Sequence, residues 1–183
     1  MYGLLEKYKT ESAVLCRAYK LNEYHYLFLH KILTYPLIIL STFSSVIAGL
    51  RRPELEYVIL AISLVILILS GFNTVINPKA KEFFNNKIST EFNDIALNVN
   101  QFIIENNKSK DEIKIYSQKT LELFEIWKSM APEIPSRFTN QAKIEIASQV
   151  KKRNSESAEL SKKTFHLTES KPLKESIHIE IKK

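Results

Sequence analysis

The chain has 183 residues, about the length of one ordinary domain, and 45% of them are hydrophobic although the mean hydropathy is only −0.13. A strongly apolar stretch must therefore be balanced by polar flanks, which excludes the even spread of apolar residues seen in a globular core. The net charge of +6 suits an anionic membrane or an acidic partner; no segment interleaves arginines with aromatics and glycines, so we expect no nucleic acid partner.

Residues 1–31 predict an amphipathic helix that approaches a membrane. Leucines and tyrosines recur among lysines and glutamates without a proline. Aromatic side chains become frequent toward the end of this range, at Tyr24, Tyr26 and Phe28. Amphipathic rings are stable at the level of the lipid headgroups, so we expect this end to lie at a bilayer surface.

Two uncharged segments follow, and each is long enough to cross a bilayer. They cover about residues 32–50 (ILTYPLIILSTFSSVIAGL) and 55–76, the second being uncharged from Tyr57 onward. The turn between them, RRPELE, is too short to be a domain. The fold class predicted is therefore an all-α membrane protein in which residues 32–76 form a two-helix transmembrane hairpin, with both termini on one side.

Small residues in these segments predict the helix-packing face. Ser41, Ser45 and Gly49 are spaced by four, a pattern that lets a second helix approach closely in lipid. Ser63 and Ser70 of the second segment extend the prediction, with hydroxyls available for interhelical hydrogen bonds. An alternative stays open, in which these polar residues line the seam of an oligomeric pore.

The distribution of basic residues predicts the orientation. Lysines and arginines near the spans are more frequent outside the hairpin than in its turn, which holds only Arg51 and Arg52. Cytoplasmic flanks carry the excess of basic residues, so we expect both termini in the cytosol.

Residues 77–131 predict a helical hairpin or coiled-coil region. Asn77 and Pro78 are typical of a helix start, and Ser109 with Glu112 has the spacing of a capping box before a second helix. The first helix carries an apolar stripe with steps of four and three, at Phe84, Ile88, Phe92, Ile95, Val99 and Phe102.

The C-terminal part is polar. A short basic helix is expected within residues 132–153, and the Ser, Lys and Glu content of residues 154–183 predicts an extended or disordered tail. Ile177, Ile179 and Ile181 alternate with polar residues, which is strand periodicity that could add to the sheet of a partner. We therefore predict partner binding here, with Lys171 and Lys174 as neighbouring basic residues.

No pattern points to catalysis, a cofactor or a metal. One cysteine, Cys16, gives no cysteine-based metal site, and His25 and His30 lie five apart, which is not the spacing of a zinc-binding helix. Three glycines form no phosphate-binding loop. No Asp, Glu, Lys, Arg or His lies within residues 32–50 or 57–76, so neither apolar segment offers a proton or ion path. We expect a protein that is not an enzyme.

The order of features resembles the SLATT-type proteins with two transmembrane helices, especially the versions encoded by large nucleocytoplasmic DNA viruses. The likeness covers about residues 20 to 105 and includes a PxxxLST pattern at Pro36 to Thr42, a GxxT pattern at Gly71 to Thr74 and a KxxxEF pattern at Lys87 to Phe92.

This resemblance implies two functions. Viral versions are candidates for structural or minor capsid-associated proteins of the membrane inside the virion, which implies an inner membrane derived from host endoplasmic reticulum. Expected partners are then the lipid bilayer, capsid, scaffold or other shell proteins, and possibly a second copy of the chain. Bacterial versions are suspected pore-forming effectors, which implies the alternative of an oligomeric protein that permeabilises membranes.

Overall fold

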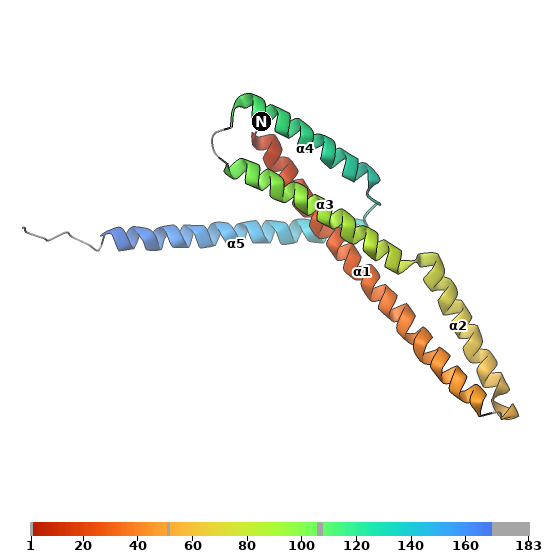
Figure 1. Ribbon diagram of the computed structural model, residues 1–183. Coiled ribbons are helices and arrows are strands. Elements are labelled where there is room, and N and C mark those ends of the chain that lie inside the picture. The colour runs from red at the N-terminus through yellow and green to blue at the C-terminus, as the bar shows by residue number, and fades with distance from the viewer. Residues whose placement is uncertain (1, 51, 106–107, 170–183) are drawn as a thin grey trace, which may run out of the picture. The chain divides into compact units, whose positions relative to one another are not determined.

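The computed structural model describes residues 2–50, 52–105 and 108–169, with side chains up to residue 157. The elements in chain order are α1 (Tyr2–Gly49), the short 3-10 helix η1 (Pro53–Leu55), α2 (Glu56–Ile76), α3 (Pro78–Ile104), α4 (Lys110–Met130) and α5 (Ser136–Glu169) (Figure 1). None of the described residues forms a strand, and the predicted all-helical class is confirmed.

Helix α1 crosses the boundary that the sequence predicted between residues 31 and 32. The amphipathic segment and the first apolar segment therefore form one continuous helix of 48 residues, with Pro36 inside it. The change from polar to apolar residues decides whether the helix is surrounded by water, protein or lipid. It supplies no capping residue, so the backbone hydrogen bonding of the helix continues across it.

Asn77 separates α2 from α3. Its φ of 44° and ψ of 59° are left-handed, a conformation that asparagine tolerates better than most residues. The Ala80 amide donates a hydrogen bond of 3.3 Å to Asn77 Oδ1, and Pro78 occupies the first turn of α3. The predicted helix start is confirmed, and the chain passes from one helix to the next without a loop.

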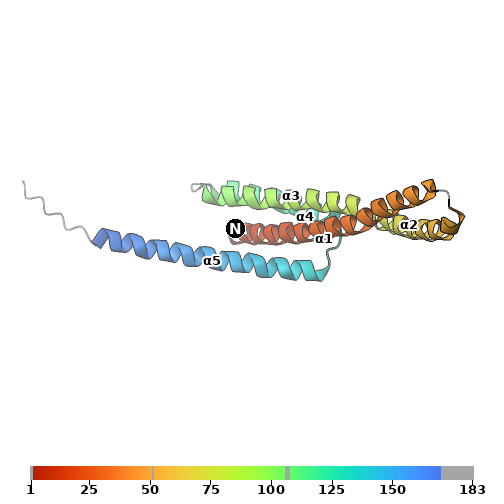
Figure 2. The same cartoon turned by 90° about the horizontal axis from the view of Figure 1, so that it is seen from below.

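The N-terminal half of α1 packs along α3, and α4 packs against both (Figures 1 and 2). Lys9 donates a hydrogen bond of 3.2 Å to Asn100, and Lys20 donates one of 3.2 Å to Asn86. The later residue of α1 thus pairs with the earlier residue of α3, so the two helices are antiparallel. We call this assembly the bundle. Its buried core consists of Leu5, Tyr19, Ile88, Phe92, Ile95, Val99, Ile113 and Phe124.

The buried face of α3 begins one residue later than the apolar stripe suggested. Phe84 is exposed, whereas Asn85 is buried and continues the alternation of three and four residues through Ile88 and Phe92. A step of four twice in succession, from 84 to 88 to 92, would rotate Phe84 away from α1. The three-and-four spacing of the residues that face α1 therefore decides which side chain is buried here, although the buried residue is polar and the exposed one is apolar.

The predicted capping box at the start of α4 is confirmed. Glu112 N donates to Ser109 Oγ at 3.2 Å, and Ser109 N donates to Glu112 Oε2 at 2.8 Å. At the other end of α4, the Tyr19 hydroxyl donates a hydrogen bond of 2.8 Å to the Pro132 carbonyl. The segment between α4 and α5 is thereby attached to α1.

The C-terminal region differs from the prediction. Residues 2–143 belong to one compact unit, and residue 144 begins another. A short helix within residues 132–153 and an extended or disordered tail from residue 154 were predicted, but α5 continues to Glu169. The rest of the predicted tail, residues 170–183, lies outside the described residues. Straight-chain Lys and Glu have good helix propensity even without a core, and an ion pair of 3.9 Å joins Lys152 to Glu156 one turn later.

Candidate functional site

The second half of α1 and the whole of α2 expose large apolar side chains. Tyr57 is 84% exposed and Leu60 69%, and Ile39 and Phe43 are also exposed. The two most apolar windows have mean hydropathies of 1.7 and 2.5, with 6% and none of their residues buried. In a soluble protein, so large a continuous apolar surface on a core helix would be covered by other parts of the chain. These are two helices long and apolar enough to cross a membrane.

The two apolar helices lie side by side, joined through η1 (Figure 1). Most of their partly or fully buried residues recur at steps of three and four, which defines one contact face on each helix. On α1 this face comprises Leu33, Leu37, Leu40, Ser44 and Ile47; facing it are Leu55 of η1 and Ile59, Ile62, Ile66, Leu69 and Asn73 of α2. Large aliphatic side chains therefore form most of the contact.

The predicted helix-packing residues lie elsewhere. Ser41, Ser45, Gly49, Ser63 and Ser70 are all exposed, and a Cβ added at Gly49 would meet no other atom within 4 Å. In the single chain these residues therefore lie outside the contact between α1 and α2, and a helix-packing role for them stays a prediction.

The rotation of α1 explains this result. Because α1 is one rigid helix, its contact with α3 in the bundle fixes which face its second half presents to α2. Leu5, Ser12, Tyr19 and Asn22 are buried in the bundle at seven- and three-residue steps, and Leu33, Leu37 and Leu40 continue that seam. Ser41 and Ser45 fall on a different side of the helix.

Hydroxyl groups in the apolar region bond within their own helices. Thr42 donates to the Ile38 carbonyl at 2.8 Å, and Ser45 donates to the Ser41 carbonyl at 2.9 Å. Thr74 donates to the Ser70 carbonyl at 2.9 Å. Each of these three hydroxyls therefore donates its proton within its own helix, and Ser45 does so in place of the predicted bond to another helix.

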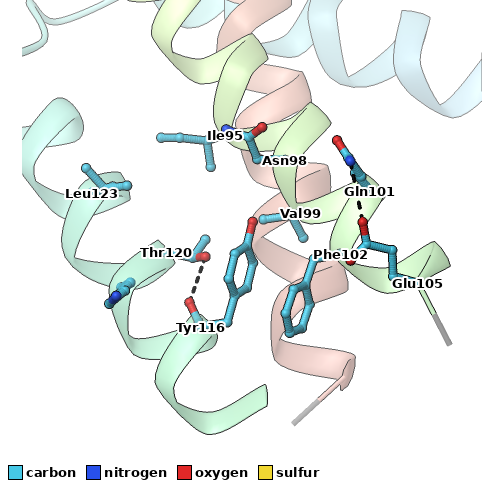
Figure 3. A pocket seen from close by; sticks show the side chains of 10 residues that line it. Ile95, Asn98, Val99, Gln101, Phe102, Glu105, Tyr116, Thr120 and Leu123 are labelled. Carbon is cyan, nitrogen blue, oxygen red and sulfur yellow. Dashed lines mark hydrogen bonds between the residues drawn. The ribbon is translucent and has the colours of Figure 1, made fainter. Parts of the chain in front are cut away.

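A groove of about 390 Å³ lies between α3 and α4 in the bundle (Figure 3). The Phe102 and Tyr116 rings stack in it with centroids 3.9 Å apart, and burial raises the pKa of Tyr116. Glu105 lies at the rim, where Gln101 donates to it at 3.4 Å and Lys108 pairs with it at 3.0 Å. The ion pair lowers the pKa of the Glu105 carboxyl. The exposed surface of this groove is mainly apolar, and Glu105 at its rim is already paired.

The histidines serve local contacts. The His25 ring lies 5.7 Å from the Phe138 ring, and His30 Nδ1 is 3.2 Å from the Thr34 hydroxyl. Within the described ranges, no group of three or more His, Cys, Asp or Glu side chains is placed to hold a metal ion.

The predicted partner-binding residues Lys171, Lys174, Ile177, Ile179 and Ile181 lie outside the described residues. Sequence reasoning missed the buried amide pair, in which Asn22 Nδ2 donates to Asn85 Oδ1 at 3.0 Å. The signal was present, because both asparagines occupy seam positions of the three-and-four pattern.

No family model, no curated protein and no solved structure matches this chain.

Proposed function

We propose that this chain is a structural membrane anchor. In this proposal the second half of α1 and α2 cross the bilayer as an antiparallel hairpin, and the bundle stands on one membrane face. The observation that carries it is the contrast within α1, whose first half is buried in a packed bundle while its second half exposes large apolar side chains. Hydrocarbon is the surrounding in which such exposure is stable.

Both termini are assigned to the cytosol. The support is the excess of lysines before residue 32 and after residue 76 compared with the short turn. The exposed positions of Lys31, Lys79 and Lys87 agree with a basic surface next to the headgroups.

The narrower proposal is a virion protein. We place the anchor in an inner membrane derived from host endoplasmic reticulum, where the antiparallel coiled-coil helices and the C-terminal tail contact an overlying capsid or scaffold protein. Two considerations support it: the resemblance to viral SLATT-type proteins, and the fact that the cytosolic face of such a membrane points toward a shell assembled in the cytosol.

Cysteine labelling tests the membrane topology. The single native cysteine permits a Cys16→Ser background into which Glu54→Cys (turn) or Asn140→Cys (start of α5) is introduced; both positions are exposed. In sealed microsomes we expect a membrane-impermeant maleimide to label position 140, and to label position 54 only after detergent is added. Labelling of both positions in intact vesicles would contradict the hairpin.

Cross-linking mass spectrometry on the native source tests the partner. We expect cross-links from Lys171 or Lys174 to a shell or scaffold protein. Lys119, an exposed lysine of the bundle, is the matched comparison for general surface reactivity. If only copies of the chain itself are cross-linked, the anchor proposal loses its partner and the oligomeric effector becomes the better account.

The second candidate is a pore-forming oligomer, and one observation favours it. The exposed Ser41, Ser45 and Gly49 face is left uncovered by α2 and could be covered by another copy. Leakage of dye from liposomes separates the candidates, because an anchor should release none at low occupancy. Gly49→Leu should abolish leakage by a pore, whereas Leu60→Val on the exposed side of α2 should preserve it.

A further inference from the structure

A pocket of about 580 Å³ lies where α2 ends and α3 begins. Asn22 and Tyr26 of α1 form one wall, and Glu133 comes from the segment after α4. The α2–α3 junction forms another wall, through Val75, Ile76, Asn77, Ala80 and Lys81. The bond from the Tyr19 hydroxyl to the Pro132 carbonyl holds this last segment in place. The pocket is therefore at the level at which the apolar helices pass into the polar bundle.

The side-chain oxygen of Asn22, Oδ1, is a hydrogen-bond acceptor that receives no hydrogen bond from another described residue. The residue is only 4% exposed, and its Nδ2 donates to Asn85 Oδ1, while Asn85 Nδ2 donates to the Lys81 carbonyl at 2.6 Å. This series of amides runs in one direction and ends at Asn22 Oδ1, which accepts no hydrogen bond. Turning the Asn22 amide over would break its bond to Asn85, so a hydrogen-bond donor placed at this pocket would complete the series.

The pocket also carries one charge of each sign. Lys81 Nζ lies 5.4 Å from the centroid of the Tyr26 ring and remains exposed. The Glu133 carboxylate is exposed and forms no ion pair with another described residue. A ligand that carries both a phosphate and a hydrogen-bond-donating ammonium would match the cation, the anion and the Asn22 acceptor together.

Val75 and Ile76 extend this pocket toward the apolar helices, and Val75 is exposed. A headgroup in the pocket could thus keep its acyl chains in contact with the exposed surface of α2. We propose that the pocket binds the headgroup of phosphatidylethanolamine, an inference that rests on the membrane insertion proposed above. The phosphate pairs with Lys81, and the ammonium donates to Glu133 and Asn22.

Other common headgroups fit less well. The choline group of phosphatidylcholine is a cation without an N–H, so it cannot donate to Asn22. Phosphatidylserine places an additional carboxylate next to Glu133, and phosphatidylglycerol brings no cation to this glutamate. Selectivity for an ammonium donor is therefore the signature of the site.

The test is native mass spectrometry of the full chain in detergent, titrated with phosphatidylethanolamine or phosphatidylcholine of identical acyl chains. We expect the ethanolamine lipid to bind at about fivefold lower concentration, the ratio that one net hydrogen bond of about 1 kcal/mol gives. Glu133→Gln should remove this preference, and Lys81→Gln should weaken binding of both lipids.

Two controls keep the result specific. Glu125→Gln and Lys79→Gln change the same charges at exposed positions that do not line the pocket, and both should bind as the wild type does. Equal binding of the two lipids by the wild-type chain would overturn the proposal. A preference that survives Glu133→Gln would overturn it as well.

Soluble glycerophosphoethanolamine distinguishes a membrane lipid from a free headgroup compound. We expect weak competition, because it lacks the acyl chains; competition as strong as that of the lipid would overturn the lipid assignment. The outcome is separable from the proposed function. A chain that is integral in membranes but shows no headgroup preference contradicts this site alone, whereas a chain released from membranes at alkaline pH contradicts the anchor.

Discussion

In the first half of α1, Leu5, Ala18 and Tyr19 are buried against other helices, whereas in its second half Ile39, Phe43 and Val46 are exposed. Both halves belong to one uninterrupted helix. One helix can therefore be stabilised by neighbouring helices along its first half and by a different, apolar surrounding along its second half. A narrow apolar stripe is enough where neighbouring helices supply the rest of the core, while an apolar surface all round is stable only in hydrocarbon.

The strongest test of the bundle is Phe92→Ala. Phe92 is fully buried between the rings of Tyr19 and Phe124, with centroids 5.9 and 5.7 Å away. We expect the free energy of unfolding of the bundle to fall by about 3 to 5 kcal/mol, measured by chemical denaturation followed by circular dichroism. Phe83→Ala removes a ring that is 72% exposed and should change it by less than about 0.5 kcal/mol.

The matching test of the apolar half is Leu64→Arg, at the middle of α2. An arginine at the centre of a spanning helix costs about 2.5 to 3.5 kcal/mol of insertion free energy, so we expect a lower fraction of membrane-integrated chains after translation with microsomes. Leu97→Arg places the same charge at an exposed position of α3 and should insert normally. Equal integration of both variants would mean that α2 does not lie in hydrocarbon.

A smaller effect is expected from Ser109→Ala, which removes the cap of α4. The loss should be about 0.5 to 2 kcal/mol of bundle stability by thermal unfolding. Ser129→Ala is the control, because the Ser129 hydroxyl bonds only to a carbonyl in its own helix, at 2.8 Å.

The capping box also predicts an acid-dependent loss of stability. Hydrogen bonds from the Ser109 backbone and side chain lower the pKa of Glu112 below its ordinary value of 4.5. A lowered pKa means that the folded state prefers the carboxylate. The contribution is therefore complete above pH 4.5 and is lost as the pH falls through the folded-state pKa. Ser109→Ala should flatten this part of the pH profile only in part, because the backbone N–H of residue 109 still donates to the Glu112 carboxylate.

Tyr19 gives the smallest expected effect at neutral pH. Burial raises the pKa of Tyr19 from 10.0 to about 12, so the folded bundle holds its proton where the unfolded chain releases it. Stability should therefore fall as the pH rises from 10 to 12. Tyr19→Phe removes this dependence and costs about 0.5 to 1.5 kcal/mol at neutral pH through the lost bond to Pro132. Tyr24→Phe, at an exposed tyrosine, should do neither.

Several features of the fold could be predicted because they depend on a few neighbouring residues. The start of α3 follows from Asn77 and Pro78, and the start of α4 follows from Ser109 and Glu112. The two apolar helices follow from composition over about twenty residues. In the C-terminal region the same kind of reasoning was wrong: a lack of apolar residues argues against a buried core, but it does not prevent residues 154–169 from being helical.

The helical class, the two apolar helices and the caps follow from the amino-acid sequence alone, because helix caps and hydropathy depend on short windows of residues. Which helix faces meet depends on the packing of the whole bundle. An all-apolar helix has no preferred side, so the contact of α1 with α2 is set by the rotation that α3 imposes on α1 in the bundle. For that reason Leu37 and Leu40 face α2, while Ser41 and Ser45 face outward, and Asn85 takes the seam position that Phe84 was expected to fill.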